Sequence, residues 1–263
     1  KPASAEPPPA APAPQAPAAI QYPRTFAGHR LSMIAFPLGG VAAGTVSLGG
    51  RGQLRDWEIF NRPDKGHSVS YAFPSIWAQS GAAKPVARVL ESRMMVPYQN
   101  GFGLSPNRVS GLTRLEDASF TGEYPLARID FRDRDLPVKV SLEAFTPIIP
   151  LDAEESGLPI AILRYTVANP GKETAKVSIA FSMENPAGLD IRNSGARQPI
   201  LNQRTSEYRA EGDLAGLLMT NPGTPKDDPL AGSFVVGVIG GEGGHITHLR
   251  GWPKAKWWAS PLL

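Results

Sequence analysis

The chain has 263 residues, of which 27 are Lys or Arg and 24 are Asp or Glu, and its formal net charge is +3. No apolar stretch reaches the eighteen or so residues of a membrane-spanning helix, and no run of five basic residues suggests nucleic-acid binding. The chain has no Cys, which excludes disulfide bonds and thiolate sites.

The N-terminal residues 1–23 form the first compositional segment. They contain eight Pro and eight Ala, and their charged residues are Lys1 and Glu6. Such a segment cannot bury enough surface to offset the entropy of ordering, which predicts a disordered tether. Ala3-Ser4-Ala5 resembles the small-residue end of a secretory cleavage site, although no apolar segment precedes it in the sequence. Mainly because Pro/Ala-rich tethers commonly follow export signals, we expect export to the periplasm or beyond, with a cytoplasmic location as the alternative.

From residue 24 to residue 263 the hydrophobic pattern has a period of two. Val138, Val140, Leu142 and Ala144 alternate with polar residues, which is typical of a strand with one buried face. Further strands are predicted at Gly44–Leu48, Leu54–Ile59, Ser75–Gln79, Ala87–Glu91, Ala127–Phe131, Ile160–Val167, Ala175–Phe181, Leu214–Thr220 and Phe234–Ile239. With turn signals every eight to fifteen residues, the pattern predicts an all-β fold, a large antiparallel β-sandwich of the supersandwich type.

Two connections have distinctive sequences. Asn169–Glu173 is a turn cluster of hairpin length between two predicted strands. Thr146–Pro150 is a stiff corner, because Pro147 and Pro150 fix φ and remove two backbone donors. A strand must end or change sheets there.

The patterns that could bind a cofactor or metal have simpler interpretations. The run Gly39–Thr45 lacks the Lys of a phosphate-binding loop and leads into a strand, so a tight turn is expected. His245 and His248 face opposite sides if they lie on a strand, and no Cys or carboxylate cluster accompanies them. We therefore expect neither a metal nor a cofactor.

Glycosidic cleavage requires two carboxyl groups that flank the bond. The acidic candidates fall into three groups. Asp56 and Glu58 flank Trp57 in a predicted strand, and Asp133 and Asp135 lie at a charged hairpin tip. Asp152, Glu154 and Glu155 lie in a solvated loop after the corner. Their spacing does not single out an acid and a nucleophile, so no catalytic residue is assigned to this chain.

Four segments resemble the N-terminal domain of glycoside hydrolase family 116, the group of bile-acid β-glucosidases and non-lysosomal glucosylceramidases. They are Phe36–Thr45, Gly111–Arg114, Phe120–Pro125 and the run from Glu143 through the corner to Gly157-Leu158-Pro159, and the resemblance spans most of residues 30 to 185. It implies that the catalytic Glu and Asp lie in a C-terminal (α/α)6 barrel, whose long helical period this chain does not contain. The chain alone would then be inactive, and would buttress the barrel of a retaining β-glucosidase-like enzyme.

Aromatic side chains provide the candidates for contact with substrate or a neighbouring domain. Trp252, Trp257 and Trp258 lie within seven residues of one another, and they could stack on a sugar, cap the sandwich or dock on another domain. Trp57 and Arg62 belong to a segment that is similar to a family loop near the mouth of the barrel.

The resemblance also implies strands beyond Leu263, since family members continue with closing strands before the barrel. We expect this chain to lack them and to expose an edge and an apolar face, so that residues 24–263 associate or pair with a missing segment. The alternative is an exported carbohydrate-binding or adhesion sandwich without catalysis. A structural sandwich without a ligand is a third possibility.

Overall fold

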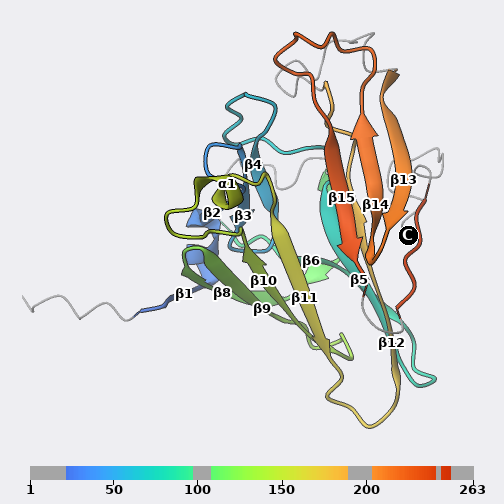
Figure 1. Cartoon of the computed structure of the whole chain (residues 1–263). Helices are drawn as coiled ribbons and strands as arrows, with labels where there is room; N and C mark the ends of the chain where they lie inside the picture. The colour runs from blue at the N-terminus through green and yellow to red at the C-terminus, as the bar shows by residue number, and fades with distance from the viewer. Residues whose placement is uncertain (1–21, 97–107, 189–202, 241–243, 250–263) are drawn as a thin grey trace, which may run out of the picture.

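The computed structural model describes residues 22–96, 108–188, 203–240 and 244–249, and it confirms an all-β sandwich (Figure 1). The large sheet consists of β1 (Arg24–Ala27), β8 (Asp117–Glu123), β9 (Leu126–Arg132), β10 (Lys139–Phe145) and β11 (Ile162–Ala168), in that order. The second sheet has the order β12 (Ala175–Ser182), β5 (Phe73–Ser80), β6 (Val86–Ser92) and β7 (Arg114–Leu115).

Two smaller sheets complete the described part of the chain. The N-terminal sheet contains β2 (Ala35–Leu38), β3 (Thr45–Gly49) and β4 (Leu54–Glu58). The C-terminal sheet contains β13 (Thr205–Glu211), β14 (Leu214–Thr220) and β15 (Phe234–Ile239). Among the described strands only β6 and β7 pair in parallel. A 3-10 helix, η1 (Gly28–Met33), and one helical turn, α1 (Ala153–Ser156), interrupt the strands. No helix in the described ranges is long and apolar enough to cross a membrane.

The core forms where the predicted period of two places apolar side chains. Val140, Leu142 and Ala144 of β10 are buried, whereas Lys139 is exposed, as the alternation predicts. They join one cluster with buried residues of the second and N-terminal sheets, including Ile76. Full burial of a side chain such as Leu142 contributes about 2 kcal/mol relative to exposure, so these three sheets are held together mainly by the hydrophobic effect.

The turn Asn169–Glu173 does not close a hairpin. The strand before it, β11, pairs with β10, whereas β12 after it pairs with β5 in the second sheet. The chain therefore crosses between sheets at this turn. The apolar side chains of β12 are only partly covered, since Val177 and Ile179 remain 37% and 42% exposed.

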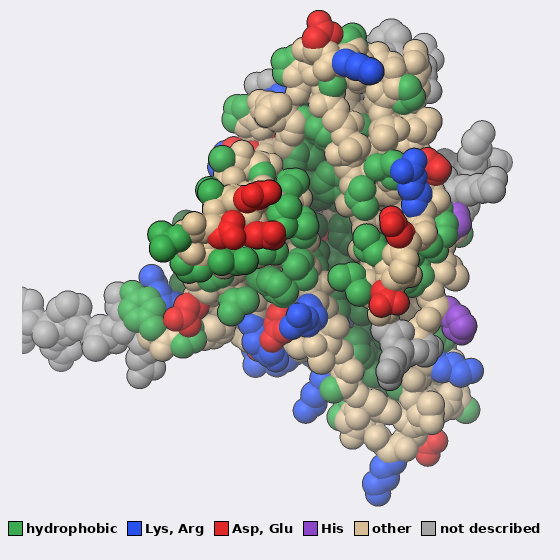
Figure 2. All heavy atoms as spheres, viewed as in Figure 1, with side chains coloured by type: hydrophobic (Ala, Val, Ile, Leu, Met, Phe, Trp, Pro, Cys, Tyr) green, Lys and Arg blue, Asp and Glu red, His purple; other side chains and the backbone are tan. Residues whose placement is uncertain are grey.

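Between β11 and the C-terminal sheet, Figure 2 shows a furrow lined by hydrophobic side chains. On β11, Leu163, Tyr165 and Val167 are half-buried against the core. β11 and β12 are therefore edge strands whose apolar side chains are only partly covered. Exposed strand edges of this kind favour pairing with a further chain segment.

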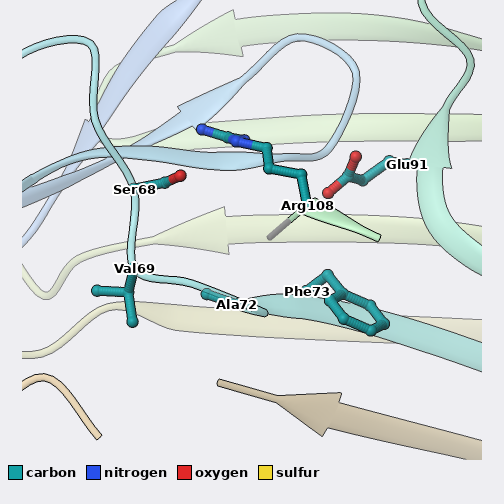
Figure 3. Close-up of a pocket in the computed structure, with 6 residues that line it drawn as sticks. All are labelled: Ser68, Val69, Ala72, Phe73, Glu91 and Arg108. Atoms are coloured by element: carbon teal, nitrogen blue, oxygen red, sulfur yellow. The ribbon is translucent and has the colours of Figure 1, made fainter. Parts of the chain in front are cut away.

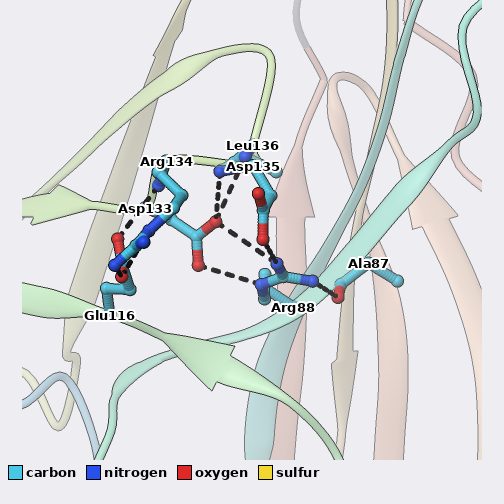
Figure 4. A network of polar contacts seen from close by, with 7 residues as sticks. All are labelled: Ala87, Arg88, Glu116, Asp133, Arg134, Asp135 and Leu136. Carbon is cyan, nitrogen blue, oxygen red and sulfur yellow. Dashed lines mark hydrogen bonds and ion pairs between the residues drawn. The ribbon is translucent and has the colours of Figure 1, made fainter.

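An ion-pair network joins the large sheet to the second sheet (Figure 4). Asp133, in the tip between β9 and β10, accepts hydrogen bonds from Arg88 Nε at 2.9 Å and Nη2 at 3.3 Å. The same carboxylate accepts from the backbone N–H of Leu136, which fixes the shape of the tip. The charged hairpin tip predicted from the sequence is confirmed, and Asp133 also connects the two layers.

Candidate functional site

Two of the sequence segments described above meet at one end of the large sheet. The loop between β2 and β3 contains Gly39 and Val41, and the corner after β10 contains Thr146 and Ser156. Gly39 N–H donates to Thr146 Oγ1 at 2.7 Å, and Val41 N–H donates to the Ser156 carbonyl at 2.8 Å. These bonds join residues about 110 positions apart, so the two loops form a single structural unit.

Glycine is required where the two loops approach most closely. A Cβ atom on Gly40 would lie 2.3 Å from the carbonyl oxygen of Leu158 and 2.5 Å from that of Gly157. Both are backbone atoms, which cannot move aside as the end of a flexible side chain can. The glycine run therefore has a packing function, and the expected tight turn between two strands is confirmed.

The corner itself is held by side-chain hydrogen bonds. Ser156 Oγ accepts from Ile149 N–H at 2.9 Å and donates to the Ile149 carbonyl at 3.0 Å. Thr146 Oγ1 donates to the Ile160 carbonyl at 3.3 Å. Asp152 caps α1 by accepting from Glu155 N–H at 3.0 Å. The acidic loop is thus an ordered helical turn.

This ordered corner exposes a mixed apolar and acidic surface. We define the corner surface as the exposed apolar residues of the two loops together with the carboxylates of α1 and its cap: Val41, Ile149, Leu151, Leu158, Ile160, Asp152, Glu154 and Glu155. Figure 2 shows acidic side chains ringed by hydrophobic ones over α1. Leu151 is fully exposed and adopts a left-handed backbone conformation, with φ at +68°. Contiguous exposed apolar side chains on a rigid support are typical of a protein-interaction surface.

Two of the carboxylates considered for catalysis have structural partners. Glu58 lies 2.5 Å from Lys65 Nζ, and Asp133 belongs to the connection between sheets. Within the described ranges, no group of three or more His, Asp or Glu side chains could hold a metal ion. His248 stacks on Tyr208 with ring centroids 4.1 Å apart.

Asp56 is a buried carboxylate with a strained backbone. Its φ is +53°, and its Oδ1 accepts from Gly66 N–H at 2.7 Å while Arg55 Nε lies 3.2 Å from Oδ2. Burial alone would raise the pKa of Asp56, but the hydrogen bond from Gly66 and the charge of Arg55 hold it below the usual range. Asp56 therefore anchors the loop that joins β4 to β5.

Asp56→Asn tests this anchoring role, because Asn tolerates the left-handed conformation as Asp does. We expect the free energy of unfolding at neutral pH to fall by about 2 kcal/mol, since a buried charge-assisted hydrogen bond is weakened. The folded pKa is depressed, so the carboxylate stabilises above its unfolded pKa and the effect is lost as pH falls through the folded value. Urea unfolding at several pH values should show the two proteins converging in acid; a difference that persists unchanged would contradict the assignment.

The structure separates the site residues that the sequence suggests. Trp57 is 3% exposed and packs against Phe234, with ring centroids 5.9 Å apart, so its indole belongs to the core and not to a surface entrance. Arg62 is half-buried in the loop after β4. Trp252, Trp257 and Trp258 lie outside the described residues. The apolar residues of the corner surface were missed as site residues, although the proline-rich corner marked their position.

One comparison with known proteins bears on this arrangement. A family model described as beta-glucosidase 2, glycosyl-hydrolase family 116 N-term, matches residues 35–259. The matched range includes both loops of the corner surface and extends over most of the chain.

Proposed function

Because the chain belongs to the family of N-terminal domains of glycoside hydrolase family 116, we propose that it is a non-catalytic sandwich that supports a catalytic (α/α)6 barrel. The family membership implies a C-terminal catalytic domain. In this proposal the barrel carries the catalytic carboxyl groups and acts with retention on β-linked glucosides, including those of the glucosylceramide type. The proline- and alanine-rich N-terminus favours export of the whole protein.

The corner surface is the observation that supports docking. Its apolar side chains are exposed in the described chain, and covering them contributes about 25 cal/mol per Å² of apolar area. The hydrogen bonds of Thr146 and Ser156 already order both loops, so docking loses little conformational entropy. The carboxylates of α1 favour basic side chains on the opposing face of the barrel.

The remaining acidic candidates support the non-catalytic assignment. Asp56, Glu58 and Asp133 each contact a basic side chain at 2.5–3.2 Å. A general acid or a nucleophile must instead reach the glycosidic bond from an accessible position. In the proposal these three groups maintain the sandwich, and hydrolysis takes place on the barrel.

Leu151→Asp in the polypeptide that contains both domains tests the docking. The variant would place a charge in an apolar contact, so we expect docking to weaken at least about tenfold and calorimetry to show two separate unfolding transitions instead of one coupled transition. In the isolated chain the same change should alter the free energy of unfolding by no more than about 0.5 kcal/mol, because Leu151 is fully exposed.

Leu249→Asp is the matched control, since Leu249 is 78% exposed and lies outside the corner surface. It should leave the coupled transition and the hydrolysis of p-nitrophenyl β-glucoside unchanged. Coupled unfolding in Leu151→Asp would refute docking at the corner. Hydrolysis by the isolated chain would refute the non-catalytic role.

A further inference from the structure

The cavity shown in Figure 3 is too small for any ligand larger than water. It is lined by residues of the β4–β5 loop, the start of β5, the end of β6 and the turn before β7: Ser68, Val69, Ala72, Phe73, Glu91 and Arg108. Its volume of about 10 Å³ corresponds to a single water molecule. An interaction with a larger partner therefore requires an exposed surface.

The outer face of the large sheet has one apolar row. Leu126, Phe145 and Ile162 lie opposite one another on β9, β10 and β11, and we call them the outer row. Their side chains point away from the core, because the adjacent Ala127 and Ala144 are buried in it and successive side chains of a strand alternate. Leu126 is 58% exposed, and Phe145 and Ile162 are half-buried. Polar residues are the usual choice for such positions, so an apolar row on three neighbouring strands indicates contact with a partner.

The next row on the same face is charged, and its charges are paired within the sheet. Arg128 and Arg164 pair with Glu143 between them, at 3.4 Å and 3.5 Å. The guanidinium group of Arg164 also lies 5.3 Å from the centre of the Phe145 ring, an attractive contact that holds both side chains against the sheet. This ion-paired row limits the apolar surface on one side.

On its other side the outer row continues into the corner surface. Ile160, two positions before Ile162, is 42% exposed. Glu154 and Glu155 follow in the exposed turn α1. Figure 2 shows hydrophobic side chains between the acidic groups over α1 and the charged side chains further along the large sheet. A partner gains most from this surface if its own face is apolar in the middle and basic toward α1.

The spacing of the outer row fits a helix that lies across the strands. Neighbouring strands are about 4.8 Å apart, and successive turns of an α-helix are about 5.4 Å apart along its axis. An amphipathic helix in this orientation presents one apolar side chain to each of β9, β10 and β11. An extended segment repeats its side chains on one face about every 6.6 Å, which matches the strand spacing less well.

We propose that the outer row receives an amphipathic helix that lies across β9, β10 and β11 and has basic side chains on the flank toward α1. The inference rests on the proposed function, since it identifies the docking element as a helix of the catalytic barrel. Its apolar stripe covers the outer row, and its basic flank pairs with Glu154 and Glu155. The contact between the domains then extends from the corner surface onto the outer face of the large sheet.

Photo-crosslinking in the polypeptide that contains both domains tests the helix directly. With p-benzoylphenylalanine in place of Leu126, we expect cross-links to barrel residues three or four positions apart on one helix. The matched control has the same group in place of Thr166, which is exposed on β11 beyond the ion-paired row, and it should not cross-link to the barrel. Cross-links from position 126 to alternate residues of an extended segment or to a second copy, or an absence of cross-links, would contradict the proposal.

Leu126→Lys separates this inference from docking at the corner. The new charge would meet the apolar stripe, so we expect docking to weaken about tenfold and the coupled unfolding transition to divide into two. Thr166→Lys should leave the transition coupled. In the isolated chain both variants should keep the unfolding midpoint within about 2 °C, because both positions are exposed.

The outcomes for Leu126→Lys and Leu151→Asp are read together. Coupled unfolding in Leu126→Lys, with separate transitions in Leu151→Asp, would exclude a helix on the outer row and leave docking at the corner intact. Coupled unfolding in both variants would refute docking as well.

Discussion

Gly40→Ala is expected to lower the free energy of unfolding by about 3 kcal/mol, because the new methyl group meets backbone where no space exists. The added Cβ would lie 2.3 Å from the Leu158 carbonyl oxygen and 2.5 Å from that of Gly157. Separating the loops would also strain the hydrogen bond from Val41 to Ser156. Urea unfolding followed by tryptophan fluorescence measures the loss.

Gly111→Ala is the control for this substitution. Nothing lies within 4 Å of a Cβ at Gly111, and its φ is not in the left-handed region, so the same chemical change should cost less than about 0.5 kcal/mol. If the two variants were equally stable, the close approach of the glycine loop to the corner would be wrong. If Gly40→Ala also exposed the amides of residues 156–158 to hydrogen exchange, the joint between the loops would be confirmed directly.

Asp133→Ala is expected to destabilise the protein by about 3 kcal/mol, since it leaves the largely buried guanidinium of Arg88 without its main partner. The side chain of Asp133 is 2% exposed and that of Arg88 is 14% exposed. Arg88 would keep the exposed carboxylate of Asp135, at 3.2 Å, and the carbonyl group of Ala87, at 3.0 Å. Denaturant unfolding measures the change, and hydrogen exchange should rise in both β6 and β10.

The matched control is Asp130→Ala in the neighbouring strand β9. Asp130 also pairs with an arginine, Arg128, but both side chains are about half exposed. Exposed ion pairs contribute between zero and about 1 kcal/mol, so this variant should remain close to the wild type. Equal losses at the two positions would mean that Asp133 contributes to its own turn and not to the connection between sheets.

Strand positions could be predicted from the sequence because alternation marks one apolar face along each strand. Val140, Leu142 and Ala144 are buried as that pattern requires. Alternation does not specify the neighbouring strand, which explains why the crossing at Asn169–Glu173 was not foreseen. The partner of β12 is β5, and such pairing depends on packing between residues far apart in the sequence.

The candidate site was only partly predictable for related reasons. Asp56 and Trp57 are adjacent and both buried, since the left-handed φ of Asp56 and a register shift between β3 and β4 break the alternation. No residue pattern signals that irregularity. The prolines of the corner indicated where β10 ends, but the contact between Gly40 and Leu158 requires three-dimensional coordinates. The acidic residues after the corner were correctly expected to be solvated.

The pairing of β12 with β5 also governs how the chain must be made. Ile179 lies opposite Ile76, about a hundred residues earlier, so β5 leaves the ribosome long before its outer neighbour exists. At roughly 5–20 residues per second, this edge of β5 waits several seconds with its hydrogen-bonding groups unpaired. Ile76 and Ala78, which are buried in the folded protein, lie on β5 and belong to the strand that lacks its partner during this time. Synthesis of this protein therefore passes through a stage at which molecular chaperones have a strand to protect.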